Sequence, residues 1–178
     1  MIELVRPTTD LATSWWHLVD SFAGEPIHGS GYRHADRGAV TDPAAFEEWT
    51  TWLARQEVAG DHIGPGRVPA AYRWILEDGQ VVGTITVRLE LNELLAQSGG
   101  HIAYAVQPPS RRRGIASGAL ALALQLAARR GIDRVLISCE DDNLASMRTI
   151  LRAGGVPAGS GGGLRRYWVI TGNGPAPE

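Results

Sequence analysis

The sequence predicts an α/β fold built around a mixed β-sheet, and three observations support this class. Short runs of apolar and β-branched residues alternate with longer helical patterns along the 178-residue chain. A strand–helix–strand unit over residues 102–139 implies a right-handed parallel crossover. Short turns join the strands that precede this unit, which favours antiparallel pairs. We therefore expect about six to seven mixed strands and about four helices.

The first half of the chain reads as one strand, two helices and a hairpin. Asp42 can cap the second helix, and Pro43 suits its first turn. The expected elements are the strand 2–6, a helix from Thr9 or Asp10 to about 22, the loop 24–41, a helix from 42, the loop 60–69, and the strands 71–76 and 81–89 around the turn 77–80.

The second half reads as alternating strands and helices. Gly131 is expected to end the longer helix, because glycine readily adopts the left-handed conformation found there. The expected elements are the connection 92–100, the strand 101–106, the helix 116–130, the strand 134–139, a helix from 143 to 154–155, and a last strand or two at 156 and 164–171 around the turn 159–163. Residues 1–171 should form a single domain, and the tail 172–178 should be disordered.

Composition limits the function and the location. The net charge of −2 gives no general attraction to nucleic acid or to a membrane, so neither is expected as a partner. Cys139 is the only cysteine, so no intrachain disulfide can form. The N-terminus lacks the pattern of a signal peptide, and no apolar run is long enough to cross a membrane. We therefore expect a cytoplasmic protein.

The segment Arg111 to Ala116 carries the clearest functional signal. It joins a strand to a long helix, and the free N–H groups of a first helical turn favour a negatively charged ligand. Gly114 lets the backbone approach a phosphate closely. The arginines could instead be solvated and the glycine a plain turn residue. However, cations at a helix N-terminus oppose the helix dipole unless an anion is bound there.

The spacing Arg-x-x-Gly-x-Ala in this context resembles the pyrophosphate-binding loop of the GCN5-related N-acetyltransferases, the GNAT superfamily, which use acetyl-CoA. The order of elements is similar to the GNAT fold from end to end. The second half also resembles a subgroup of predicted bacterial acetyltransferases. The segments that carry these resemblances are 27–31, 88–92, 99–104, 111–116, 142–146 and 154–155.

The resemblance implies where acetyl-CoA would bind. The central parallel strands would splay apart, and the pantetheine arm would enter between 102–106 and 134–139. Backbone groups of the first strand would pair with that arm, the loop would hold the pyrophosphate, and Arg112 or Arg113 would reach the ribose 3′-phosphate. Asn143 could contact the arm, cap its helix, or do both. The implied cofactor-binding residues are Ala105, Val106, Arg111, Arg112, Arg113, Gly114, Ile115, Ala116, Ser117, Asn143 and Ser146. No metal is implied.

The resemblance also implies direct transfer of the acetyl group to an amine in a ternary complex. Many GNAT members place a tyrosine seven residues after the helix-opening asparagine, where it protonates the leaving thiolate, but this chain has Ile150 there. Tyr104 is the candidate substitute, although it could be an ordinary strand aromatic. Glu90 and Glu140 are the candidate general bases. Nothing in the sequence pairs a histidine with Cys139, which disfavours an acyl-enzyme.

The acceptor should be a primary amine of a small molecule, an amino acid or a peptide, by analogy with the superfamily. The residues expected to bind it are His28, Tyr32, Arg88 and Asn92, together with the turn 159–163. A homodimer is a further expectation from the resemblance. A second interpretation is a non-catalytic acyl-CoA-binding or regulatory module of the same fold, which the isoleucine at 150 favours. A nucleotide-binding protein is disfavoured because its glycine-rich motifs are missing.

Overall fold

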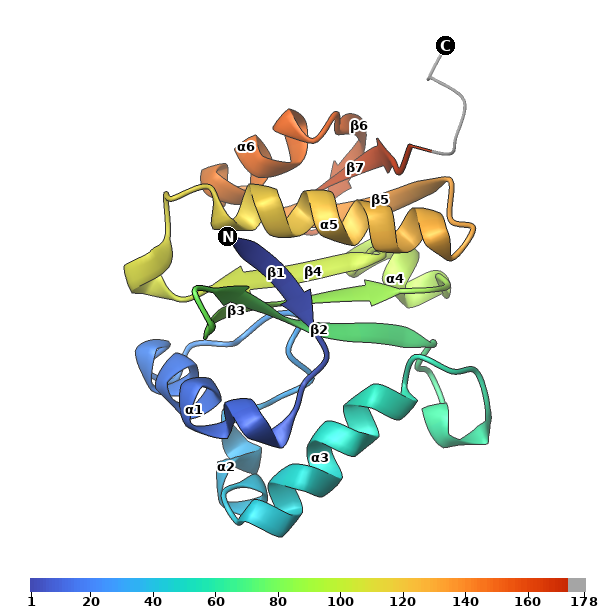
Figure 1. Ribbon diagram of the computed structural model, residues 1–178. Coiled ribbons are helices and arrows are strands. Elements are labelled where there is room, and N and C mark those ends of the chain that lie inside the picture. The colour runs from blue at the N-terminus through green and yellow to red at the C-terminus, as the bar shows by residue number, and fades with distance from the viewer. Residues whose placement is uncertain (173–178) are drawn as a thin grey trace.

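The computed structural model describes residues 1–172, which form two separate β-sheets with helices around them (Figure 1). The first sheet has the order β1-β2-β3-β4 and the second the order β5-β7-β6, and every recorded ladder is antiparallel. The strands are β1 Ile2–Val5, β2 Ala70–Glu77, β3 Gln80–Arg88, β4 Ile102–Val106, β5 Arg134–Glu140, β6 Val156–Gly161 and β7 Leu164–Ile170.

The predicted α/β class, the number of strands and the divergence of the two central strands are confirmed, whereas the described strands form two antiparallel sheets instead of one mixed sheet. β4 and β5 share no ladder, although helix α5 connects them as the crossover predicted. The segment 159–161, expected as part of a turn, belongs to β6 because it pairs with β7 in a hairpin. The local pattern could not decide whether β4 and β5 pair, because they lie far apart in the sequence. The glycine-rich segment 159–161 was expected to be a turn because glycine weakens the signal of a strand.

The described residues contain six α-helices instead of about four. They are α1 Ala12–Ser21, α2 Arg37–Val40, α3 Pro43–Arg55, α4 Glu93–Ser98, α5 Ile115–Arg129 and α6 Leu144–Arg152. The additional helices, α2 and α4, lie in segments expected to be loops, and both are too short to show an apolar period. The cap of α4 explains its position, because the Asn92 side chain accepts a hydrogen bond from the Leu95 amide at 2.9 Å.

The expected helix boundaries are largely confirmed. The Asp42 carboxylate accepts hydrogen bonds from the amides of Ala44 and Ala45 at 3.0 and 3.2 Å, and Pro43 is the first residue of α3. Gly131, just after α5, has a φ of 75°. The first helix starts later than expected, because a 3-10 turn over Thr9–Leu11 precedes α1. Of the tail, residues 173–178 lie outside the described part of the chain, so its expected disorder stays a prediction.

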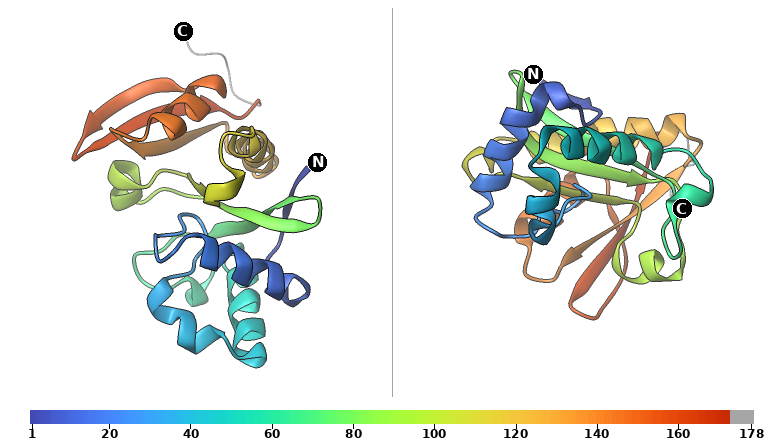
Figure 2. Two further views of the ribbon diagram at one scale, coloured as in Figure 1. Left: turned by 90° about the vertical axis from the view of Figure 1, so that its left-hand side faces the viewer. Right: turned by 90° about the horizontal axis from the view of Figure 1, so that it is seen from below.

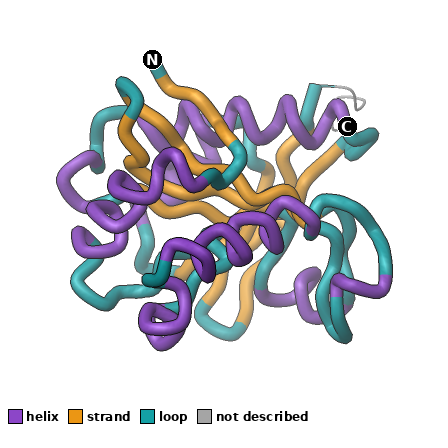
Figure 3. Tube along the Cα trace, turned by 60° about the horizontal axis from the view of Figure 1, so that its bottom comes forward, coloured by secondary structure: helices purple, strands orange, loops and turns teal. Residues whose placement is uncertain are grey.

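Helices cover the four-stranded sheet on both faces. Figure 2 shows α1, α2 and α3 below this sheet, with α5 on the side that faces the three-stranded sheet. Figure 3 shows α1 and α3 in front of the strands. The buried aromatic rings beneath the sheet include Trp15 and Trp74, which stack with centroids 4.9 Å apart. No helix within residues 1–172 is long and apolar enough to cross a membrane.

A buried carboxylate joins the helices below the sheet to the helix above it. Glu57, just beyond α3, is 3% exposed and pairs with Arg73 on β2 at 3.0 Å and with Arg6 at 3.1 Å. It also pairs with Arg130 at the end of α5. Burial raises the pKa of Glu57, but hydrogen bonds and charge from Arg73, with the charges of Arg130 and Arg6, outweigh burial and hold that pKa below its usual range.

We expect Glu57→Gln to lower the free energy of unfolding at pH 7 by about 3 kcal/mol, because it leaves partly buried guanidinium groups without a counter-charge. The stabilisation from a carboxylate with a depressed pKa is present above the unfolded pKa of about 4.3 and is lost as the pH falls through the folded pKa. The difference between wild type and variant should therefore shrink in acid.

Urea unfolding of both proteins between pH 7 and pH 3 measures this difference. Glu48→Gln is the control, because Glu48 is an exposed residue of α3 with no ion pair recorded in the described part of the chain. Equal stability of Glu57→Gln and wild type at pH 7 would contradict the role assigned to the network.

Candidate active site

The site lies where β4 and β5 diverge. At one end the two strands are joined: the His101 amide donates to the Leu136 carbonyl at 2.6 Å, and the Leu136 amide donates to Nδ1 of His101 at 2.9 Å. An isolated bridge between Gly100 and Ile137 lies beside these bonds. Beyond this junction the strands belong to different sheets, so a gap with unpaired strand edges opens toward Val106.

The register of β3 and β4 decides which backbone groups face this gap. The Arg88 amide donates to the His101 carbonyl at 2.7 Å, and the Gln107 amide donates to the Val82 carbonyl at 2.9 Å. Bonded positions alternate along an antiparallel pair, so Tyr104 and Val106 turn their amide and carbonyl groups toward the gap. The backbone of Ala105 faces β3 instead, so the expectation that it would pair with the pantetheine arm is wrong.

The same argument identifies the groups that β5 presents. The Asp141 amide donates to the Gly163 carbonyl and the Thr171 amide to the Asp133 carbonyl, both at 3.0 Å. Odd-numbered residues of β5 therefore bond to β7, and the backbone of Ser138 faces the gap. The Ser138 hydroxyl oxygen is buried and has no partner among the described residues. Sequence reasoning did not identify Ser138, because only the pairing register distinguishes it from its neighbours.

The loop between β4 and α5 has the geometry of an anion site. Gly114 is left-handed with a φ of 81°, and a side chain there would meet no atom within 4 Å. Arg112 has a φ of 63°, whereas Arg113 between them has a negative φ. Such alternation directs successive amides into one concavity. Within the described residues, no backbone acceptor is recorded for the amides of 112–117, which include Ile115, Ala116 and Ser117 in the first turn of α5.

The three arginines of the loop have different surroundings. The Arg111 Nε donates to the Val106 carbonyl at 3.0 Å. Arg113 forms an ion pair with Glu77 at 2.9 Å. Arg112 is exposed and has no recorded partner in the part of the chain that the structure describes. Of the two arginines expected to reach a 3′-phosphate, Arg112 is therefore the one not already paired.

Helix α6 closes the gap on the other side. Asn143 caps this helix by accepting a hydrogen bond from the Ser146 amide at 3.0 Å. The Ser146 hydroxyl in turn lies 2.8 Å from the Tyr104 hydroxyl. Ile150 is fully buried in the core, and Gly155 packs so closely on it that a side chain on that glycine would lie 2.7 Å from Ile150. The position where many GNAT members carry a tyrosine is thus packed core.

The segment 27–31 covers the face of β3 and β4 that points away from α5. Thr84 Oγ1 donates to the His28 carbonyl at 2.9 Å, and Thr86 Oγ1 donates to the Gly29 carbonyl at 2.5 Å. Gly29 has a φ of 77°, and a side chain there would lie 2.2 Å from the Ala103 carbonyl oxygen. Only glycine permits this close approach. The His28 side chain is exposed beside the sheet, where it remains a predicted acceptor contact.

Three of the four residues expected to bind the acceptor also make contacts within the protein, and their part in acceptor binding stays a prediction. The Tyr32 ring is 6% exposed and packs edge-on against Trp15 at 5.6 Å. Arg88 Nη1 donates to the Gly99 and Gly100 carbonyls at 3.3 and 3.0 Å. Asn92 caps α4 and donates to the Gly66 carbonyl at 3.0 Å. The Arg88 and Asn92 side chains hold the surrounding loops in place, because their polar groups bond within the protein. The buried Tyr32 hydroxyl, in contrast, has no recorded partner among the described residues.

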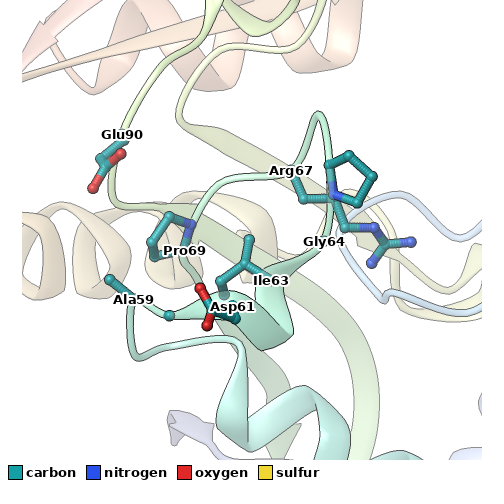
Figure 4. A pocket seen from close by; sticks show the side chains of 9 residues that line it. Ala59, Asp61, Ile63, Gly64, Arg67, Pro69 and Glu90 are labelled. Atoms are coloured by element: carbon teal, nitrogen blue, oxygen red, sulfur yellow. The ribbon is translucent and has the colours of Figure 1, made fainter.

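The two candidate bases lie in different places. Glu140 is exposed at the end of β5, on the face away from α5. Glu90 lines an open pocket of about 390 Å³ formed mainly by residues 59–69, and Figure 4 shows it across this pocket from Gly64 and Arg67. Glu90 also follows Ile85, the β3 partner of Tyr104, by five residues. Glu90 is two residues beyond the end of β3, in the loop that borders this pocket.

Comparison with known proteins agrees with this geometry. Residues 34–155, more than half of the chain, match the model of the acetyltransferase (GNAT) family, so the chain belongs to that family. No curated protein matched the sequence. Among the described residues, no group of three or more His, Cys, Asp or Glu side chains could hold a metal ion.

Solved structures similar to this chain are acetyltransferases. The microcin C7 self-immunity acetyltransferase MccE, in complex with acetyl-CoA and AMP, has a TM-score of 0.64 and 18% identity, covering 95% of this chain and 92% of its own. RimJ from Mycobacterium smegmatis, in complex with CoA-disulfide, has a TM-score of 0.65 and 19% identity, covering 94% of this chain and 80% of its own. The ribosomal L7/L12 α-N-protein acetyltransferase RimL, in complex with coenzyme A, has a TM-score of 0.63 and 18% identity, covering 95% of this chain and 93% of its own. At these identities the likeness shows the shared fold.

The junction at His101 makes stability depend on pH. Burial, with the positive charge of Arg88, lowers the pKa of His101 to about 4. An unfolded histidine titrates near 6.5, so the unfolded state takes up its proton first. The free energy of unfolding should therefore fall by about 3 kcal/mol as the pH drops from about 6.5 to about 4, and this contribution should be complete above 6.5.

Urea unfolding across this pH range should show the fall in wild type and in His17→Asn, because His17 is exposed on α1. His101→Asn should lack it. The same pH dependence in His101→Asn as in wild type would show that another group is responsible.

Proposed function

We propose that the protein is an acetyl-CoA-dependent N-acetyltransferase that acts on a primary amine of a small molecule, an amino acid or a peptide. The observation that carries this proposal is the gap between β4 and β5, which ends at a loop of unpaired amides. Unpaired strand edges can hold an amide-containing chain, and the loop can hold phosphates. A linear ligand with amides at one end and a pyrophosphate at the other matches this order of groups.

The residues present fit acetyl-CoA, which supplies an acetyl group as a thioester when it is bound. The edge groups of Tyr104 and Val106 would pair with the pantetheine amides. Since the Val106 carbonyl accepts from Arg111, that guanidinium would have to move when the carbonyl takes a ligand. The open space beside Gly114 leaves room for a phosphate, and Arg112 is the unpaired cation beside it.

The chain itself would contribute positioning and charge stabilisation. An amide of β4 that faces the gap, at Tyr104 or Val106, would donate to the carbonyl oxygen as negative charge develops on it. The segment 27–31 would hold the amine against the gap, because its backbone is fixed by Thr84 and Thr86. Glu140, at the open end of β5, is the better placed of the two candidate bases.

The acceptor class follows from no single side chain. RimL is an α-N-protein acetyltransferase of ribosomal L7/L12, and MccE is a microcin C7 self-immunity acetyltransferase, so similar folds serve different functions. A cytoplasmic location and a homodimer also stay predictions. The alternative function, a non-catalytic acyl-CoA-binding module, is favoured by one observation: Ile150 is packed core. Release of free CoA with a panel of primary amines distinguishes the two functions, because a binding module would bind acetyl-CoA without releasing CoA.

Calorimetry should detect acetyl-CoA binding by wild type. Gly114→Val should weaken the affinity for acetyl-CoA by about tenfold or more, equivalent to about 1.4 kcal/mol. Valine is strained at the φ of 81° and would fill the space left for a phosphate. ATP serves as the control ligand.

The matched control is Gly131→Val at the other end of α5, where φ is 75° and no atom lies within 4 Å of the added carbon. It imposes similar strain without touching the loop, so it should bind acetyl-CoA as wild type does. Absence of binding by folded wild type would overturn the proposed function, and equal affinity in Gly114→Val would overturn the assignment of the loop.

A further inference from the structure

Helix α6 offers no group at position 150 that could protonate a leaving thiolate. Ile150 is 0% exposed, within the core cluster that also contains Cys139. Gly155 already packs against Ile150, so we expect a larger aromatic ring at 150 to force its neighbours to shift. If this fold transfers an acetyl group with acid assistance, the acid must come from another element.

Tyr104 is the hydroxyl-bearing residue that crosses the gap. Its backbone lies on the open edge of β4, in the four-stranded sheet, while its hydroxyl contacts Ser146 on α6 at 2.8 Å. Helix α6 follows β5 of the other sheet, so the phenol ring reaches from one half of the molecule to the other. Its hydroxyl therefore lies where α6 meets the α5-facing side of β4 and β5, beside the divergence of the two strands and close enough to Cys139 of β5 to affect its pKa.

The surroundings keep this phenol protonated. Burial raises the pKa of Tyr104, the nearby Cys139 raises it further, and hydrogen bonds from Ser146 and Thr149 lower it in part. Burial likewise raises the pKa of the Cys139 thiol. Both groups are thus neutral near pH 7. Ser146 also lies in the first turn of α6, where the positive end of the helix dipole would stabilise a transient phenolate.

We propose that Tyr104 is the general acid of the acetyl transfer and that Ser146 is a positioning residue that orients its hydroxyl; this inference rests on the proposed function. As the amine nitrogen bonds to the acetyl carbon, the carbon–sulfur bond breaks and its electron pair stays on sulfur. Tyr104 gives its proton to that sulfur. The amine loses one proton to water or a base, and solvent returns a proton to the phenolate through Ser146.

The test compares Tyr104→Phe, Ser146→Ala and the double variant with wild type. Three quantities are measured: kcat for CoA release with the best amine of the panel or, without one, for hydrolysis of acetyl-CoA; the Kd of acetyl-CoA by calorimetry; and the melting temperature. Tyr104→Phe should lower kcat about 100-fold with little change in Kd. Ser146→Ala should lower kcat less, and the double variant should be no slower than Tyr104→Phe, because both hydroxyls act in one step.

A spectroscopic readout needs no turnover. In the unliganded protein, which has four tyrosines, burial raises the pKa of both Tyr32 and Tyr104, so Tyr104→Phe should remove one of the late steps in an alkaline titration of tyrosinate absorbance and leave the other. In Ser146→Ala the Tyr104 phenol should titrate at still higher pH, because one of the hydrogen bonds that lower its pKa is gone. Tyr167→Phe, which removes a different buried phenol on β7, is the matched control and should keep both kcat and that titration step.

The outcomes separate the two proposals. An unchanged kcat in Tyr104→Phe, with wild type active, overturns only the inference. The inference is also overturned if a lower melting temperature or a weaker affinity for acetyl-CoA accounts for the whole fall in kcat, because Tyr104 would then act only by stabilising the structure. If Tyr104→Phe does not fold, the same comparison is made with Ser146→Ala, and an unchanged kcat in that variant overturns the inference. A wild type that binds acetyl-CoA but never releases CoA overturns the proposed function, and the inference with it.

Discussion

The divergence of β4 from β5 is the constraint on which the rest of the site depends. Two strands that pair fully would leave no free backbone edge between them. Here the His101 amide donates to the Leu136 carbonyl, and the His101 ring accepts from the Leu136 amide, which joins the strands at one end. Both backbone polar groups of Leu136 are therefore satisfied without a regular ladder between the strands. Past that point each strand pairs only with its own sheet, so backbone groups of Tyr104 and Ser138 and the Val106 amide stay available, whereas the Val106 carbonyl accepts from Arg111.

Two further contacts hold the halves around this gap. Helix α5 starts at the amide-rich loop and ends just before Arg130, whose pair with Glu57 connects this end of the helix to the end of α3 on the opposite side of the sheet. Beneath the sheet, the packed rings of Trp15, Tyr32 and Trp74 anchor the chain that continues into the segment 27–31. The loop for an anion and the cover for an amine are therefore positioned by packing elsewhere in the molecule.

The site needs few side chains because most of its groups are backbone amides and carbonyls. Transfer of an acetyl group from a thioester requires mainly that the reactants be held together, that charge on the carbonyl oxygen be stabilised, and that a proton reach the sulfur. The first two requirements are met by strand edges and a helix N-terminus. The third depends on one hydroxyl, and a tyrosine on β4 can supply it as well as one on α6, since both elements border the same gap.

Local features were readable from the sequence because their causes are local. The caps at Asp42 and Asn143, the left-handed Gly131 and the helix start at the loop 111–116 each depend on a few neighbouring residues and on the helix beside them. Tertiary structure alone decided the rest. Whether Ala105 or Val106 faces the gap depends on a register with β3, and a shift of one residue would exchange them. Likewise, the burial of Tyr32, the occupied side chains of Arg88 and Asn92, and the meeting of Tyr104 with Ser146 join segments far apart in the chain, so no local pattern records them.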